Sequence, residues 1–102
     1  MAWYVYVASF FAGMFLANAV PHYVKGVCGD RFPTPFAKPP GKGLSSPVVN
    51  VVWALLNGVV GAELFRVGRI WSGNVGVLLV FVAGIAVISV MSSVNFAAKH
   101  AV

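Results

Sequence analysis

The sequence predicts an all-α membrane protein with three transmembrane helices, a long Pro/Gly-rich loop between the first and second, and a single domain over residues 1–102. Composition is the first observation: 60% of the residues are hydrophobic and 9% are charged, whereas soluble domains carry about 25% charged residues. Second, three apolar runs are each close to the ~20 residues that a helix needs to cross a bilayer. Strands in lipid require a closed barrel, which three such runs cannot build, so we expect helices.

The first expected span covers residues 2–20 and contains no charged side chain. Ala17-Asn18-Ala19 resembles the cleavage site of a signal peptide, but no Lys or Arg precedes the apolar run, so we expect the segment to remain a span. Ser9, Gly13 and Ala17 recur every four residues. We therefore expect this row of small residues to pack closely against another helix.

The expected loop covers residues 21–46 and contains four prolines between Phe32 and Pro40. Proline disfavours the helical conformation in the residue before it, so we predict a stiff extended strap along the membrane surface. The glycines that follow permit a turn, Ser45 or Ser46 is expected to cap the next helix, and Pro47 suits its first turn.

Two lysines lie close to this helix start, and a helix N-terminus with a glycine-rich approach attracts anions. We expect plain helix capping with headgroup contact, and the alternative hypothesis is a dedicated lipid-phosphate site. The residues of the hypothetical site are Lys38, Gly41, Lys42, Gly43, Ser45 and Ser46.

The second expected span covers residues 47–65 and has one polar face. Asn50, Ala54, Asn57 and Gly61 recur at i, i+4, i+7 and i+11, which is one side of a helix. Buried asparagines in lipid need partners, so the face is expected either to join helices or to hold a substrate or ion.

Glu63 is the acid within this span, and Arg66 follows three residues later. Their spacing and depth favour an ion pair at the membrane interface. The alternative is an ion-coupling carboxylate, since acids within membrane spans are often functional.

The third expected span covers residues 75–94, where Ala86, Ser89 and Ser93 share a face. Basic residues predict the orientation, because cytoplasmic loops are enriched in Lys and Arg. Five lie on the side of the long loop, and Arg66 and Arg69 lie on the other. We therefore expect a multi-pass protein with the amino terminus outside and the loop and carboxyl terminus in the cytoplasm; the five basic residues are Lys25, Arg31, Lys38, Lys42 and Lys99.

The sequence predicts no metal, cofactor or catalytic site. His22, Cys28 and His100 match no known ligand spacing. Asp30 and Glu63 are the two acids of the chain, too few for a nucleophile–base constellation. The basic residues lie in connections rather than along one helix face, which favours lipid headgroups over nucleic acid.

Residues 21–57 contain, in order, FPTPFA, GKGLSSP and an N-x-x-W helix start. In this segment the chain resembles a group of small uncharacterised bacterial integral membrane proteins. The resemblance implies a bacterial inner-membrane protein and adds no chemistry.

The packing faces predict a protein that works through helix–helix contacts, as an accessory or structural subunit of a larger membrane complex or as a homo-oligomer. Its expected partners are membrane lipids and other membrane subunits or itself. The alternative is a small oligomeric transporter or channel that uses Glu63 and the Asn50/Asn57 face. A lipid- or quinone-modifying enzyme is a third class, but the chain lacks a credible catalytic set.

Overall fold

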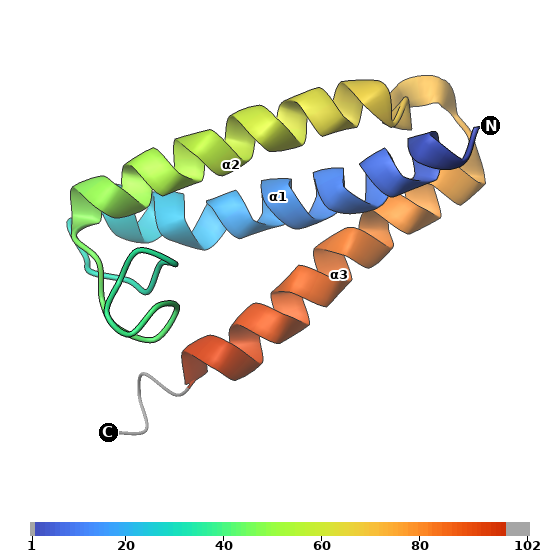
Figure 1. Cartoon of the computed structure of the whole chain (residues 1–102). Coiled ribbons are helices and arrows are strands. Elements are labelled where there is room, and N and C mark those ends of the chain that lie inside the picture. The colour runs from blue at the N-terminus through green and yellow to red at the C-terminus, as the bar shows by residue number, and fades with distance from the viewer. Residues whose placement is uncertain (1, 98–102) are drawn as a thin grey trace.

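The computed structural model describes residues 2–97, which form three long helices joined by one loop and one tight turn (Figure 1). The helices are α1 (Trp3–Val27), α2 (Pro47–Val67) and α3 (Val75–Ala97), with a short 3-10 helix, η1 (Ile70–Ser72), between the last two. All three are long and apolar enough to span a membrane, and no strand forms within residues 2–97. The all-helical class with three candidate membrane-spanning helices is therefore confirmed.

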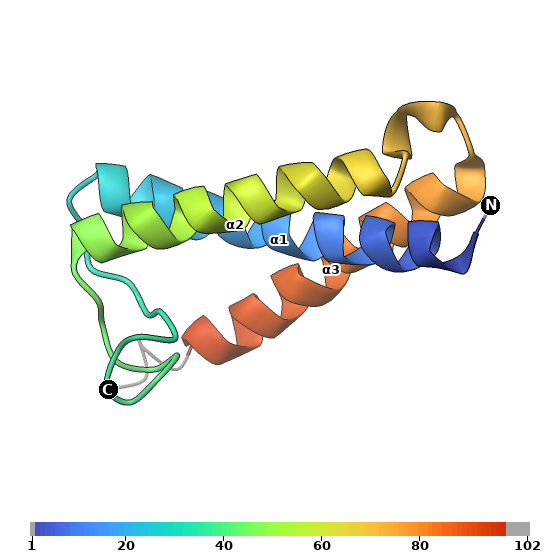
Figure 2. The same cartoon turned by 45° about the horizontal axis from the view of Figure 1, so that its top comes forward.

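Helix α1 lies at the centre of the bundle, because α2 and α3 each pack along it. Where α1 meets α3, two glycines bring the backbones into contact. A side chain at Gly13 would collide with the backbone of Phe81, and one at Gly84 would collide with the backbone of Phe10. Beyond this crossing the carboxyl-terminal half of α3 diverges from α2, as Figures 1 and 2 both show.

The turn between α2 and α3 closes the end of the bundle opposite the loop. Ile70 of η1 packs in a small core with Val5 and Val77. The Ser9 hydroxyl lies 2.7 Å from the carbonyl oxygen of Val5 and 3.1 Å from that of Gly68, so it joins α1 to the end of α2. These contacts hold the chain in place where it reverses direction.

The first helix is longer than the sequence suggested. It continues through Pro21 to Val27, rather than ending at residue 20, and α2 and α3 likewise extend to Val67 and Ala97. A proline inside a helix removes one backbone hydrogen bond. Here the turn that follows it stays helical and buries His22 and Gly26. The loop therefore begins at Cys28, not at residue 21.

The loop is not the extended strap that its prolines predicted. Phe32 and Ser45 form an antiparallel bridge. The distance from the amide nitrogen of Phe32 to the carbonyl oxygen of Ser45 is 3.3 Å, and the reciprocal distance is 3.0 Å. Between them the carbonyl oxygen of Thr34 accepts hydrogen bonds from the amides of Ala37 and Gly41. Proline excludes helix, but its fixed φ also suits turns, and the chain here folds back on itself.

Candidate functional site

A hydrogen-bonded cluster joins α1, α2 and the loop at one end of the bundle. His22, in the last turns of α1, is 2% exposed, and its Nδ1 lies 2.8 Å from Oδ1 of Asn50 on α2. The amide nitrogen of Asn50 shares its two N–H groups among three carbonyl oxygens, those of Phe32 (3.0 Å), Ser45 (3.2 Å) and Ser46 (3.0 Å). One asparagine therefore fixes the histidine ring and both ends of the folded loop.

A second polar chain lies deeper in the bundle. Asn57 of α2 donates to the carbonyl oxygen of Trp53 at 2.8 Å. Its own Oδ1 accepts a hydrogen bond of 3.1 Å from the amide nitrogen of Asn18 on α1. Asn18 lies one helical turn before His22, so both polar residues of α1 occupy the same face.

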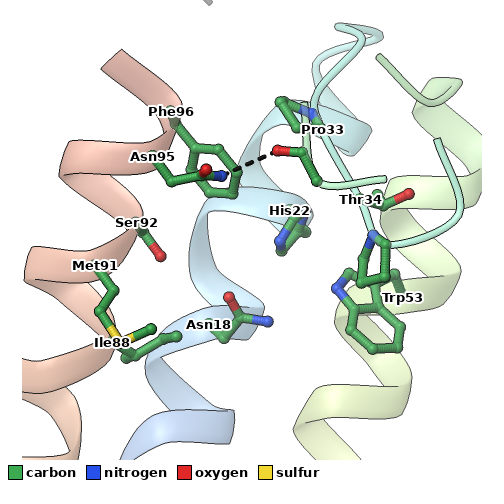
Figure 3. Close-up of a pocket in the computed structure, with 12 residues that line it drawn as sticks. Asn18, His22, Pro33, Thr34, Trp53, Ile88, Met91, Ser92, Asn95 and Phe96 are labelled. Carbon is green, nitrogen blue, oxygen red and sulfur yellow. Dashed lines mark hydrogen bonds between the residues drawn. The ribbon is translucent and has the colours of Figure 1, made fainter. Parts of the chain in front are cut away.

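These two chains border a pocket of about 290 Å³ beneath the loop. Its walls come from all three helices and the loop, as Figure 3 shows. The lining residues are Asn18, His22, Pro33, Thr34, Pro35, Gly41, Trp53, Ile88, Met91, Ser92, Asn95 and Phe96. No side chain in the lining carries a formal charge when His22 is neutral, so the pocket suits an uncharged group.

The α3 wall is connected to the loop at two points. The amide nitrogen of Asn95 donates to the carbonyl oxygen of Gly41 at 3.0 Å. The ring of Phe96 contacts those of Phe32 and His22 edge-on, at centroid distances of 4.7 and 6.1 Å. The diverging end of α3 thus closes the pocket through one hydrogen bond and one aromatic cluster.

Trp53 contributes an unusual donor to this wall. The indole Nε1 of Trp53 is buried and has no hydrogen-bond partner. It is the one such side-chain nitrogen or oxygen atom among residues 2–97. A buried donor left unpaired costs about 1–3 kcal/mol. In Figure 3 the nitrogen points toward His22 and Asn18, on the pocket side of the ring. An unpaired donor at a pocket wall calls for an explanation, and a bound acceptor supplies one.

A groove continues from the pocket along the other side of α3. It has a volume of about 480 Å³ and is lined in part by Ala17, Pro21 and Ser89. Asn18, Ile88, Ser92 and Phe96 line both spaces. A molecule with its polar end in the pocket therefore has an adjoining, mainly apolar space for the rest of its length.

The packing residues that the sequence singled out are distributed among the seams of the bundle. The buried residues of α2 are Asn50, Ala54, Asn57 and Gly61, all facing α1 or the loop. Ser9 and Gly13 of α1 are buried, and Ala17 is half-buried. The small-residue row of α3 differs, because all three of its members, Ala86, Ser89 and Ser93, are exposed.

The six residues of the hypothetical phosphate site differ in their surroundings. Ser46 caps α2, its hydroxyl accepting from the amide of Val49 at 3.2 Å. Ser45 is instead buried, with its hydroxyl bonded to that of Thr34. Lys38 and Lys42 are exposed, while Gly41 borders the pocket and Gly43 packs tightly against the backbone of Lys38.

Glu63 and Arg66 form an exposed ion pair, with the guanidinium Nε 3.2 Å from the carboxylate and a second, closer contact through Nη2. The pair lies near the end of α2 that is opposite the loop, far along the helix from Asn50 and from the pocket residue Trp53. Glu63 and the asparagines therefore do not share one site.

Within residues 2–97, no three His, Cys, Asp or Glu side chains come together. His22 is held by Asn50, and Cys28 is exposed at the end of α1. Lys99 and His100 lie outside the described residues.

Sequence reasoning did not place Asn18, His22 and Trp53 in one site. The expected first span ended at residue 20, which separated Asn18 from His22. Had the helix been continued through Pro21, their spacing of four residues would have placed both on one face. Scans against protein-family models, curated proteins and solved structures found no match.

Proposed function

We propose that this chain is a membrane-embedded binding protein that takes a small uncharged amphiphile from the bilayer into the pocket beneath the loop. The observation that carries the proposal is the sealed, unpaired N–H of Trp53 at the pocket wall. Buried polar groups in folded proteins almost always have partners. A ligand that accepts a hydrogen bond from this N–H would remove the free-energy cost of leaving the N–H unpaired, and this gain would favour binding.

The dimensions and lining support an amphiphile. Ligand pockets commonly measure ~300–1,000 Å³, so the space of 290 Å³ suits a headgroup or a small ring rather than a whole lipid. The adjoining groove along α3 has room for the start of an apolar tail. The uncharged lining offers nothing to balance a phosphate or an ammonium group.

The three tryptophans allow a direct test. Trp3 and Trp71 lie at the end of the bundle opposite the loop, so Trp53 is the tryptophan of the pocket. In a Trp3→Phe/Trp71→Phe variant, we expect the emission of Trp53 to change saturably when monooleoylglycerol is added to the protein in nanodiscs. A matched Trp53→Phe variant, which keeps an aromatic side chain and removes the indole N–H, should bind at least 10-fold more weakly in a stability-shift assay. Emission that changes only linearly with amphiphile, or equal affinity in Trp53→Phe, would refute the proposal.

A second candidate function is the helix-contact role expected from composition, as an accessory subunit or homo-oligomer. The exposed row of Ala86, Ser89 and Ser93 on α3 supports it, since the corresponding rows of α1 and α2 pack inside the chain. Small residues allow another transmembrane helix to approach closely.

Cysteine crosslinking tests this role. In a Cys28→Ser background, Ser93→Cys should crosslink to a second copy or to another subunit in the native membrane. The neighbouring exposed position, Val94→Cys, points about 100° away around the helix and should not. Equal crosslinking at both positions, or a monomer free of partners by native mass spectrometry, would exclude the role.

For location, we propose the bacterial inner membrane with the amino terminus outside and the loop in the cytoplasm. Support comes from Lys25, Arg31, Lys38 and Lys42 at the loop end, against Arg66 and Arg69 at the other end. Cys28 is exposed at the loop end and reports its side. We expect a membrane-impermeant maleimide to label Cys28 only after the cells are permeabilised. Labelling of intact cells would indicate the opposite orientation.

A further inference from the structure

We infer that the ligand of this pocket is an alcohol: an uncharged amphiphile whose headgroup carries free hydroxyl groups, as a monoacylglycerol does. The inference rests on the proposed function and adds the chemistry of the headgroup. It follows from the directions in which three polar groups at the pocket wall donate or accept hydrogen bonds.

The orientation of Asn50 fixes the histidine. Only an amide nitrogen can face three carbonyl oxygens, so the Nδ2 atom of Asn50 is the one that points to Phe32, Ser45 and Ser46. Its Oδ1 then faces Nδ1 of His22 and must accept, which places the proton of a neutral imidazole on Nδ1. The Nε2 atom of His22 is then the ring nitrogen with a lone pair, and His22 lines the pocket.

The orientation of Asn57 fixes Asn18 in the same way. The carbonyl oxygen of Trp53 requires a donor, so Nδ2 of Asn57 faces it and Oδ1 of Asn57 accepts from Asn18. The amide nitrogen of Asn18 is thereby committed to α2. Figure 3 shows the Asn18 oxygen on the other side of the amide group, toward α3 and the pocket.

The pocket therefore presents one fixed donor, the Trp53 N–H, and two fixed acceptors, His22 Nε2 and Asn18 Oδ1. A hydroxyl group both accepts and donates, so it pairs with the indole and with a lone pair. A second hydroxyl pairs with the remaining acceptor. A quinone carbonyl, an ester or a phosphate can only accept hydrogen bonds. Such a group would pair with the indole N–H but would leave His22 Nε2 and Asn18 Oδ1 without a donor.

Charge separates these classes further. Lys38 and Lys42 are exposed and do not line the pocket, so among residues 2–97 no lysine or arginine is placed to balance a phosphate there. Ser92 lines the pocket as well, and its hydroxyl adapts to either role. Asn50 and Asn57 act as positioning residues, because they orient the groups that meet the ligand.

The experiment compares monooleoylglycerol with its dimethyl ether, in which both hydroxyl hydrogens are replaced by methyl groups and every acceptor oxygen is kept. Binding is followed by the emission of Trp53 in the Trp3→Phe/Trp71→Phe variant in nanodiscs. We expect the ether to bind at least 10-fold more weakly. Equal binding of both compounds overturns the alcohol inference and leaves the binding function standing. Binding of neither overturns both.

A variant separates recognition from pocket size. Asn18→Leu removes one acceptor from a half-buried position, and we expect the preference for the alcohol over the ether to fall at least 3-fold. Ser72→Ala removes an exposed hydroxyl from η1, at the opposite end of the bundle, and should leave the preference unchanged. If Asn18→Leu still binds monooleoylglycerol with an unaltered preference over the ether, Oδ1 of Asn18 does not bind the headgroup, and the inference is overturned.

Discussion

Replacing Asn50 with leucine should destabilise the protein more than the same change at Asn57, although the two asparagines look equivalent in the sequence. All three carbonyls that Asn50 contacts keep a backbone donor: Phe32 and Ser45 bond each other, and the carbonyl of Ser46 accepts from the amide of residue 50 itself. The one group left without any partner is the Nδ1–H of His22, which is 2% exposed.

One buried orphan donor costs about 1–3 kcal/mol, and each lost bond removes about 1 kcal/mol of net stabilisation or less. We therefore expect the free energy of unfolding of Asn50→Leu to fall by about 2–4 kcal/mol. In Asn57→Leu the group left without a partner is the amide of Asn18, which is half-buried rather than buried, so a loss of about 1 kcal/mol is expected.

Reversible unfolding in mixed micelles measures both values. A second readout is trypsin cleavage after Lys42, because Asn50 holds both strands of the loop together at Phe32 and Ser45. Cleavage in the folded state should be faster in Asn50→Leu and unchanged in Asn57→Leu. If the two variants lose the same stability, or if the loop of Asn50→Leu resists trypsin like the wild type, the account of Asn50 as the loop anchor is wrong.

Three further predictions concern other parts of the fold. Gly84→Leu should separate α3 from α1 and lower the thermal midpoint, whereas Gly58→Ala meets open space and should be neutral or stabilising; equal effects would contradict the close crossing. Glu63→Gln removes an exposed pair and should leave stability and amphiphile binding unchanged; loss of ion-coupled flux in proteoliposomes would instead favour the transporter alternative. The double change Lys38→Gln/Lys42→Gln should reduce the phosphatidylglycerol retained in native mass spectra without altering amphiphile binding, and a loss of both would place the lysines at the pocket.

The fold class follows from the sequence because hydrophobic length is a strong constraint in lipid: a backbone crossing a bilayer must satisfy its own hydrogen bonds. The position of the loop boundary did not follow, since Pro21 looks like a helix end. Its single missing donor is tolerated here because His22 is held by Asn50 beyond it. Such a contact pairs residues 28 positions apart and leaves no local signal.

The loop shows the same limit. Its prolines correctly exclude helix, but turns and extended straps use similar φ values, so composition does not separate them. What selects the folded form is a set of distant partners: the bridge between Phe32 and Ser45, and the amide of Asn50 behind it. The cap at Ser46, by contrast, depends on neighbours within one helical turn, and residue types alone narrowed it to two serines.

Both asparagines of α2 were expected to join helices or to form a polar site, and their hydrogen bonds support a connection between these roles. The side-chain nitrogen of each asparagine donates to a backbone carbonyl, in the loop for Asn50 and in α2 for Asn57. The side-chain oxygen of each accepts from a polar side chain of α1, His22 or Asn18, and so orients it toward the pocket. Their bonds stabilise the α1–α2 seam and, by the same geometry, determine which hydrogen-bonding group the pocket offers. An Asn50→Asp substitution tests both roles at once, because a carboxylate loses the donors to the loop and, beside the imidazole, favours a proton on both ring nitrogens of His22. We expect the loop of this variant to become as sensitive to trypsin as that of Asn50→Leu, and the preference for the alcohol to fall, because Nε2 of His22 would then donate instead of accept. A variant that keeps the full preference would show that Nε2 of His22 does not bind the headgroup as an acceptor.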